Sequence, residues 1–154
     1  MAEYIREYHE NGNIKLEMFV INGKREGCYK YYWDNGNLSV VCNYVNDKIN
    51  GEYKSYYENQ NPIMFCNYID DKKNGEYLYY YPNGQLYEFH NYVNDEKNGY
   101  YQSYDQNGNL KIFYNYTNNK LTEIYNHTTK QFVSLTSFKK PESGTVNNPI
   151  IIDD

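Results

Sequence analysis

The sequence is poor in the residues that usually build a protein core. Leu, Ile, Val and Phe together make up only about 20% of its 154 residues, which is close to the level at which chains become disordered. Disorder also requires few aromatic residues and a high net charge. Here aromatic residues make up 19% of the chain, 22 residues are tyrosine, and the net charge is only −5. We therefore expect the chain to fold, with tyrosine taking the place of the aliphatic residues.

Other absences exclude classes of function. No apolar run approaches the ~20 residues of a membrane-spanning helix. The charged N-terminal segment 1–10 lacks the apolar core of a signal peptide. The acidic balance argues against a nucleic-acid partner, which would require a basic surface. The three cysteines are an odd number, so reduced thiols in a cytoplasmic protein are the expectation.

A repeat of 24 residues dominates what the sequence does contain. Gly27, Gly51, Gly75 and Gly99 open four near-copies of one unit. Three tyrosine positions recur with them: Tyr29, Tyr53, Tyr77 and Tyr101 two residues after the glycine, Tyr32, Tyr56, Tyr80 and Tyr104 five residues after it, and Tyr44, Tyr68, Tyr92 and Tyr116 seventeen residues after it. A fixed period of this length is typical of architectures in which each unit packs only on its neighbours.

Each unit is predicted to be one β-hairpin. Asn35-Gly36, Asn83-Gly84 and Asn107-Gly108 separate runs rich in aromatic and aliphatic residues, and the remaining good copy has Asn59-Gln60 there. Asn-Gly suits a two-residue type I′ turn, because both central residues of that turn need a positive φ. A polar turn such as 46–50 then leads the chain into the next hairpin.

The two-residue turn at Asn35-Gly36 would fix the register of its hairpin. It pairs Trp33 with Leu38, Tyr31 with Val40, Tyr29 with Cys42, and Gly27 with Tyr44. With Tyr44 opposite Gly27, the ring could lie over a residue that has no side chain, which would explain why both positions recur. A bulged three-residue turn is the alternative, and it would shift the register by one residue and exchange the two faces. We prefer the first register.

These features predict an all-β fold: a single elongated, twisted antiparallel meander of tandem hairpins, with about 10–12 strands and essentially no helix. We expect a repeat domain at 3–138, made of repeats 3–26, 27–50, 51–74, 75–98 and 99–122 and a degenerate cap at 123–138. Residues 139–154 have no period and are expected to be a disordered tail. The apolar run Ile150-Ile151-Ile152 within it is either a docking peptide or an ordinary terminus without a role.

No group of residues indicates catalysis, a cofactor or a metal. Cys42, Cys66 and His90 share one repeat position, but equivalent residues of successive hairpins lie two strands apart, ~9–10 Å. Metal ligands must lie ~2.0–2.3 Å from a single ion. The histidines are widely separated, and no serine stands in a nucleophile motif. The sequence therefore predicts a protein that is not an enzyme.

Basic residues recur in the polar turns and would line one long edge of the sheet: Lys24, Arg25, Lys48, Lys72, Lys73 and Lys97. Such a row could approach an anionic lipid headgroup layer, at ~1 kcal/mol per residue near the surface. Carboxylates alternate with these cations and cancel most of their charge. We interpret the turn carboxylates, Asp47, Asp71 and Asp95 among them, as solvated charges.

The tyrosine rows are the remaining candidates for function. A single-layer sheet cannot hide both of its faces from water, and tyrosine is enriched at protein interfaces. The row that begins with Tyr29 is expected to pack on neighbouring strands. The row formed by Tyr32, Tyr56, Tyr80 and Tyr104 is predicted to contact a protein partner, although packing is an equally good explanation of it.

The recurring Gly-x-Tyr-x-x-Tyr, Asn-Gly-x-Leu and Asn-Tyr segments resemble the MORN repeat, in the divergent variant found in bacterial antitoxin-like proteins and large DNA viruses of amoebae. The resemblance covers roughly residues 3–122. It implies an elongated antiparallel sheet that serves as a non-enzymatic scaffold for protein interaction. It also implies two alternatives: a peripheral protein that contacts membrane phosphoinositides, and an antitoxin-like neutralising protein.

Overall fold

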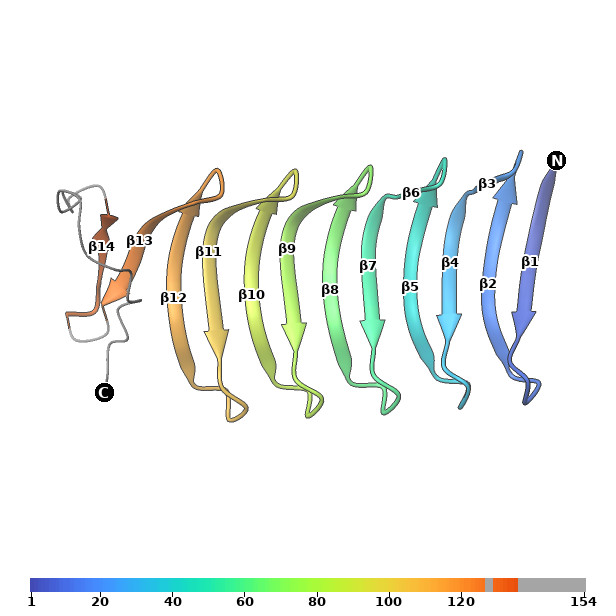
Figure 1. Ribbon diagram of the computed structural model, residues 1–154, viewed down its shortest axis with the longest axis horizontal. Helices are drawn as coiled ribbons and strands as arrows, with labels where there is room; N and C mark the ends of the chain where they lie inside the picture. The colour runs from blue at the N-terminus through green and yellow to red at the C-terminus, as the bar shows by residue number, and fades with distance from the viewer. Residues whose placement is uncertain (127–128, 136–154) are drawn as a thin grey trace, which may run out of the picture.

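The computed structural model describes residues 1–126 and 129–135. Figure 1 shows strands that lie side by side along one axis, with β1 at one end and β14 at the other. The strands are β1 (Ala2–Tyr8), β2 (Ile14–Ile21), β3 (Lys24–Arg25), β4 (Gly27–Tyr32), β5 (Leu38–Val45), β6 (Lys48–Ile49), β7 (Gly51–Tyr56), β8 (Pro62–Ile69), β9 (Lys72–Tyr80), β10 (Leu86–Val93), β11 (Glu96–Tyr104), β12 (Leu110–Thr117), β13 (Lys120–Asn126) and β14 (Gln131–Ser134). The predicted tail at 139–154 lies outside the described residues.

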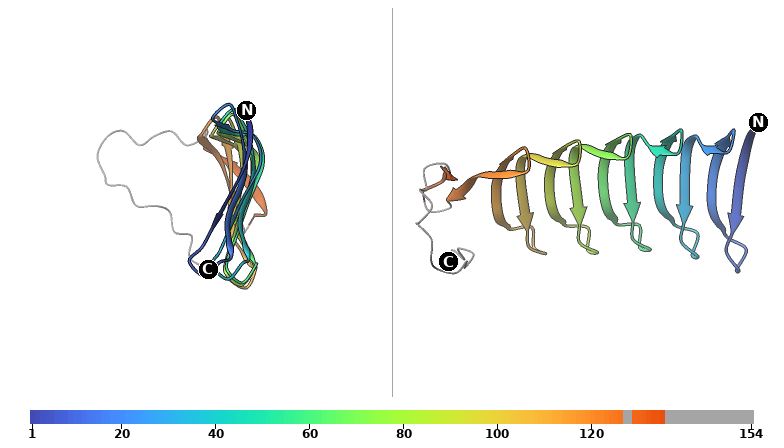
Figure 2. Two further views of the ribbon diagram at one scale, coloured as in Figure 1. Left: turned by 90° about the vertical axis from the view of Figure 1, so that its right-hand side faces the viewer. Right: turned by 45° about the horizontal axis from the view of Figure 1, so that its top comes forward.

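The sheet confirms the predicted antiparallel meander. All fourteen strands belong to one sheet, and neighbours in the sheet are neighbours in the chain. The two-residue strands β3 and β6 pair with β2 and β5 and lead into β4 and β7, which leaves twelve strands along the main path. Seen along its length in Figure 2, the sheet is a single curved layer. In the described part of the chain, no helix is long and apolar enough to cross a membrane.

The two faces of this layer differ in packing. Side chains alternate along a strand, and residues paired across strands share a face. Tyr29 pairs with Cys42 on one face, and the equivalent pairs follow it in each repeat. Apart from Ser39, which the strand ladder skips, the buried residues belong to this face, which we call the packed face: Leu16, Cys42, Tyr44, Ser55, Cys66, His90 and Ser103. The opposite face, which carries Tyr32 and Tyr56, is the open face.

The turns at the Asn-Gly positions correct one prediction. The Trp33 N–H donates to the Asn37 carbonyl at 2.8 Å, and the Gly36 N–H donates to the Trp33 carbonyl at 2.9 Å. Gly36 has a φ of +85°, whereas Asn35 keeps a negative φ. This is a three-residue loop, in which a type I turn is followed by a left-handed glycine. The predicted type I′ turn is therefore wrong, and Leu38 pairs with Tyr32 rather than with Trp33.

The predicted register holds over the rest of the hairpin because a second irregularity compensates for the longer loop. The ladder shifts by one residue between Tyr31 and Tyr32, so Tyr29 still faces Cys42 and Gly27 still faces Tyr44. The residue skipped by the ladder recurs every 24 positions: Lys15, Ser39, Ile63, Tyr87 and Lys111. A three-residue loop and a β-bulge together keep the predicted faces.

Type I′ turns do occur, at the opposite edge of the sheet. Asn46 and Asp47 have φ values of 51° and 70°, and Val45 pairs with Lys48 directly across this turn. The equivalent residue pairs also have positive φ: Asp70 and Asp71, Asn94 and Asp95, Asn118 and Asn119. Asn and Asp tolerate this conformation better than other residues with a side chain. The polar turns, and not the Asn-Gly turns, are thus the two-residue hairpin turns.

The repeated glycine is needed for its backbone conformation and not to make room for the tyrosine ring opposite it. Gly51 and Gly99 have φ of +98°, in the left-handed region that favours glycine. A Cβ atom built on Gly27 or Gly51 would meet nothing within 4 Å, so no ring fills the space above these residues. Gly75 lies at a bulge where the ladder shifts between Cys66 and Tyr68. The prediction that each glycine makes room for a ring is therefore wrong.

Candidate functional site

Aromatic residues of the open face form a stripe that crosses the strands. The ring of Tyr56 on β7 lies 6.0 Å from that of Phe65 on β8, which lies 5.6 Å from that of Tyr80 on β9. The stripe consists of the predicted tyrosines together with the phenylalanines of the returning strands: Tyr32, Tyr56, Phe65, Tyr80, Phe89, Tyr104 and Phe113. All seven are half-buried. We call this set the aromatic stripe.

The N-terminal end of the stripe is held by a carboxylate. Tyr32 Oη donates to Glu17 Oε2 at 2.9 Å, and Tyr4 Oη donates to Glu17 Oε1 at 2.7 Å. Arg6 Nη2 lies 2.6 Å from the same Oε1. The hydrogen bonds from Tyr4 and Arg6 lower the pKa of Glu17 to about 2. Burial, followed by the bond to Glu17, raises the pKa of Tyr32 to about 12.

The four predicted tyrosines are therefore not equivalent. Tyr32 donates to Glu17, and Tyr104 Oη donates to Gln102 Oε1 at 2.7 Å. In the part of the chain that the structure describes, the hydroxyls of Tyr56 and Tyr80 donate to no protein atom. Their rings are fixed by contact with Phe65. Tyr56 and Tyr80 thus combine rings packed on Phe65 with hydroxyls that bond to no other described residue.

Hydrogen bonds from side chains of one repeat to main-chain carbonyls of the next position these tyrosines, and the sequence analysis did not predict them. Trp33 Nε1 donates to the carbonyl of Tyr56 at 3.0 Å, and Tyr57 Oη donates to the carbonyl of Tyr80 at 3.1 Å. The same link joins Tyr81 to Tyr104, and His9 Nε2 lies 2.9 Å from the Tyr32 carbonyl. A ring recurs in the sequence directly after Tyr8, Tyr32, Tyr56 and Tyr80, at His9, Trp33, Tyr57 and Tyr81, and this recurrence could have indicated the bonds.

Charge next to the stripe changes along the sheet. One open-face position, three residues after the repeated glycine, carries Arg6, Lys30, Lys54, Leu78 and Gln102 in successive copies. Lys54 Nζ lies 2.7 Å from Glu52 Oε2. The open face at this position is therefore cationic in the N-terminal half and uncharged in the C-terminal half.

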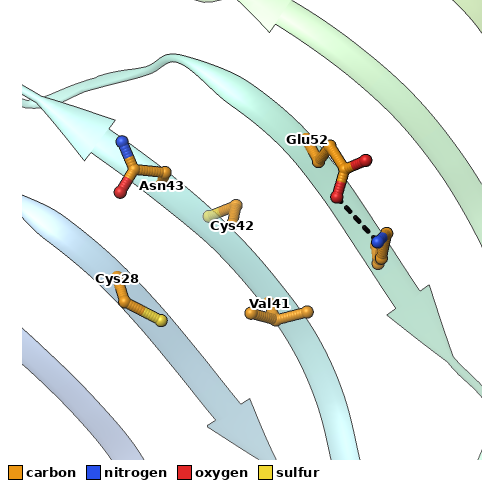
Figure 3. Close-up of a pocket in the computed structure, with 6 residues that line it drawn as sticks. Cys28, Val41, Cys42, Asn43 and Glu52 are labelled. Carbon is orange, nitrogen blue, oxygen red and sulfur yellow. Dashed lines mark ion pairs between the residues drawn. The ribbon is translucent and has the colours of Figure 1, made fainter.

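The open face also has a shallow depression of about 340 Å³ between β4, β5 and β7, shown in Figure 3. It is lined by Cys28, Val41, Asn43, Glu52 and Lys54 of the open face, together with Cys42, whose side chain belongs to the packed face. Cys28 is exposed, whereas Cys42 is buried and burial raises the pKa of its thiol to about 11. The Cys42 thiol is therefore protonated at neutral pH and is a poor nucleophile.

The predicted row of cations divides between an edge and a face. Lys24, Lys48 and Lys72 are exposed at the polar-turn edge. The other three lie over tyrosine rings of the packed face: Arg25 Cζ is 4.0 Å from the centroid of Tyr44, Lys73 Nζ is 5.3 and 5.1 Å from Tyr77 and Tyr92, and Lys97 Nζ is 5.4 Å from both Tyr101 and Tyr116. Cation–π attraction of this kind stabilises the packed face.

The turn carboxylates are more than solvated charges. Asp71 Oδ1 accepts the Ile49 N–H at 2.7 Å, and Asp95 Oδ1 accepts the Lys73 N–H at 2.8 Å. Asp47 Oδ1 accepts the Arg25 N–H at 2.9 Å, in the same geometry. These exposed residues bind the backbone of the preceding repeat, so the interpretation as solvated charge alone is wrong for them.

The row of Cys42, Cys66 and His90 lies on the packed face, where each is buried. Among the described residues, no cluster of three or more Cys, His, Asp or Glu side chains could hold a metal ion. The ring of His90 lies 4.4 Å from that of Tyr101, and His90 Nε2 lies 3.2 Å from Glu88 Oε2. Burial lowers the pKa of His90. The row is therefore part of the packing between repeats.

Comparison with known families identifies a repeat family. A sequence profile described as a MORN repeat variant matches residues 5–22, 25–46, 73–94 and 97–118, which is more than half of the chain. The segment between these matches contains the copy in which Gln60 replaces the turn glycine and Pro62 replaces the leucine. In sequence, no curated protein shows significant similarity to this chain.

Proposed function

The chain belongs to the MORN repeat family, in its repeat variant, and from this premise we propose that it is a non-enzymatic scaffold that binds a protein partner on its aromatic stripe. Repeats of this family generally act as modules that bind proteins or membrane lipids. The open face supports binding of a protein because it carries half-buried aromatic side chains, three of which, Tyr56, Phe65 and Tyr80, lie in contact across three strands. Tyrosine in such a setting offers both apolar area and a hydrogen-bonding group.

The observation that carries this proposal is the group of Tyr56, Phe65 and Tyr80. The Tyr56 and Phe65 ring centroids lie 6.0 Å apart, and those of Phe65 and Tyr80 lie 5.6 Å apart. This packing restricts the rings and so reduces the entropy that binding a partner would cost. The hydroxyls of both tyrosines make no bond to another described residue. A partner can therefore gain area and hydrogen bonds without breaking any contact of the sheet.

The exposed edge of β1 is a less suitable docking surface. An edge strand can accept a strand from a partner through its unpaired backbone groups. However, β1 carries the charged residues Glu3, Arg6 and Glu7 in a strand of seven residues. Charges on an edge strand oppose pairing with another chain. The face is therefore preferred over the edge as the binding surface.

A double substitution of Tyr56→Ser and Tyr80→Ser tests the proposal. Affinity purification from the cells that produce the protein should recover partners of the unchanged chain and lose them with the double variant. Tyr8→Ser is the matched control, because Tyr8 has the same place in the first repeat and is 58% exposed outside the stripe. Circular dichroism should show the same β-sheet signal for all three proteins. Equal recovery of the same partners by the double variant would refute binding through the stripe.

A second candidate function, contact with anionic lipid, is favoured by the polar-turn edge. Ile21, Val45 and Ile69 are 43%, 37% and 49% exposed, and each pairs with an exposed lysine: Lys24, Lys48 and Lys72. Aliphatic side chains beside cations suit the boundary of an anionic bilayer. Flotation with anionic liposomes should then show binding that weakens as salt rises. Absence of binding at low salt would remove this candidate.

A further inference from the structure

The edge of the sheet that carries the Asn-Gly loops has charge of one sign. The edge lies at the bottom of Figure 1 and consists of the loops 9–13, 33–37, 57–61, 81–85 and 105–109. These loops contain four carboxylates and neither lysine nor arginine: Glu10, Asp34, Glu58 and Asp105. The polar-turn edge, in contrast, mixes lysines with aspartates. A molecule that approaches the loop edge therefore meets a negative potential, which attracts cations.

A shallow depression of about 340 Å³ lies on this edge and spans three successive loops. Trp33, Tyr57 and Pro82 supply its apolar surface, and Glu58 and Asn59 are its polar members. We call this hollow the edge depression. Pro82 stands where the other four loops have a carboxylate or a glutamine, so no other set of loops has the same lining.

The two rings of the edge depression are held in equivalent positions. Trp33 Nε1 donates to the carbonyl of Tyr56 at 3.0 Å, and Tyr57 Oη donates to the carbonyl of Tyr80 at 3.1 Å. Both rings are half-buried. Equivalent residues of successive hairpins are two strands apart, ~9–10 Å. A cation midway between the rings would lie ~5 Å from each of them, within the ~6 Å over which a ring attracts a cation.

The polar groups of the edge depression favour a cation over an anion. Asn59 Nδ2 donates to the Pro82 carbonyl at 3.2 Å, and Asn59 Oδ1 accepts the Asn61 N–H at 3.0 Å. In the part of the chain that the structure describes, the exposed carboxylate of Glu58 forms no ion pair or hydrogen bond. Each side-chain donor of the lining thus already binds a carbonyl, and the uncommitted group is a negative acceptor.

We propose that the edge depression binds a methylated lysine side chain of a partner protein, with the trimethylammonium group between the rings of Trp33 and Tyr57 and beside Glu58. An unmodified ammonium is strongly hydrated, and one carboxylate cannot replace its hydrogen bonds to water. Methyl groups remove this need and present apolar surface to the rings and to Pro82.

The shape of the edge depression favours a protein as the carrier of this cation. Because the hollow is shallow and open, a free small cation would bury little of its surface there. A cation on a protein side chain enters from the open side while the rest of that protein contacts the loops. This site is separate from the aromatic stripe and does not depend on it.

Trp33 is the only tryptophan among the 154 residues, so its fluorescence reports on the edge depression directly. The full chain is titrated with a short peptide that carries one trimethyl-lysine. The same peptide with unmodified lysine, and one with the neutral isostere in which carbon replaces the charged nitrogen, serve as comparisons. The change in fluorescence should saturate, and trimethyl-lysine should bind about ten-fold more tightly than either comparison, since desolvated cation–π attraction has this size.

Substitutions identify the residues responsible. Tyr57→Leu should weaken binding of the trimethyl-lysine peptide about ten-fold, whereas Tyr57→Phe, which keeps the ring, should retain most of it. Tyr81→Leu is the matched control, because Tyr81 Oη donates to the Tyr104 carbonyl at 2.9 Å in the same way but does not line the depression. Glu58→Gln should weaken binding only about two-fold, because exposed charge pairs are weak. Circular dichroism checks that every variant keeps the sheet.

The outcomes separate the alternatives. Equal affinity for trimethyl-lysine and its neutral isostere would refute a cation site, since apolar contact alone would explain that result. Equal losses with Tyr57→Leu and Tyr81→Leu would assign the effect to the sheet and overturn the proposed lining. Tetramethylammonium chloride that binds as tightly as the peptide would overturn the protein carrier in favour of a free small cation. The assay does not involve the stripe, so a negative result leaves the proposed partner binding intact.

Discussion

The packed and open faces of this sheet differ in how closely they follow the repeat. On the packed face, the Tyr29–Tyr44, Tyr53–Tyr68 and Tyr77–Tyr92 ring pairs have centroid distances of 5.5, 5.8 and 5.8 Å. On the open face, the position opposite the row that begins with Arg6 and Lys30 changes in character along the sheet. It is a carboxylate in the first copy, aliphatic in the second and aromatic in the others: Glu17, Val41, Phe65, Phe89 and Phe113. Each of the ring pairs on the packed face lies within one repeat, so recurrence reports packing that every hairpin shares, and departure from recurrence reports what is particular to this chain.

A physical reason underlies this difference. In a single layer, each repeat can bury apolar surface only against the repeats beside it. The packed face achieves this with rings that lean over Cys42, Cys66 and His90, which are 3%, 5% and 4% exposed. The same rings must recur for each repeat to fit the next. The open face is not bound by this requirement, so its residues can vary from one repeat to the next.

The largest predicted effect compares one tyrosine from each face. Tyr44→Ala removes a ring that is 9% exposed and that packs on Tyr29 and Arg25, so it should lower the free energy of unfolding by about 3 kcal/mol. Tyr56→Ala removes a half-buried ring and should cost about 1 kcal/mol. Urea denaturation followed by circular dichroism measures both. If the two costs were equal, the packing distinction between the faces would be wrong.

A smaller effect is expected at the repeated glycine. Gly51→Ala places a side chain where φ is +98° and where nothing lies within 4 Å. The cost should therefore come from backbone strain alone, about 1–2 kcal/mol. Gly51→Asn should cost less than Gly51→Ala, because Asn tolerates a positive φ better. A steric origin would reverse this order, since Asn is larger, so the two midpoints of urea unfolding decide between them.

The fold could be predicted largely because its signals repeat. The alternation around Tyr29 and Cys42 defined the faces and the strand register from sequence alone. The turn type could not be assigned in this way, because glycine after asparagine suits both a type I′ turn and the left-handed end of a three-residue loop. The compensating β-bulge also could not be predicted from the sequence. The skipped position is occupied by residues as different as Ser39 and Tyr87, so it has no composition of its own.

The candidate site was predicted only in part. A period of two placed Tyr32, Tyr56, Tyr80 and Tyr104 on one face, as the structure shows. The distinction among them depends on contacts that occur once in the chain. Tyr32 is held by Glu17, fifteen residues away, and no other repeat has a carboxylate at that position. A partner that occurs once leaves no periodic signal in the sequence. Only the structure distinguishes Tyr32 and Tyr104, whose hydroxyls donate hydrogen bonds, from Tyr56 and Tyr80, whose hydroxyls donate to no described residue.

The smallest predicted effect concerns pH and the packed face. His90 is 4% exposed, and burial lowers its pKa below the ordinary 6.5. In the unfolded chain the imidazole gains a proton near pH 6.5, whereas in the folded chain it stays neutral to a lower pH. Its contribution to stability is therefore present above pH 6.5 and is lost as the pH falls toward the folded-state pKa. Urea midpoints at pH 7.5 and 5.5 should show this loss.

His90→Cys is the matched control, because cysteine occupies the same position at Cys42 and Cys66 and does not titrate in this range. The variant should lose less stability than the unchanged chain between pH 7.5 and 5.5. The charged and aromatic groups that face His90 remain in both proteins: Glu88, Lys73, Lys97, Tyr77, Tyr92 and Tyr101. An identical loss in the two proteins would assign the pH dependence to these groups or to other carboxylates. The burial of His90 on the packed face would then be too weak to keep its imidazole neutral at pH 5.5.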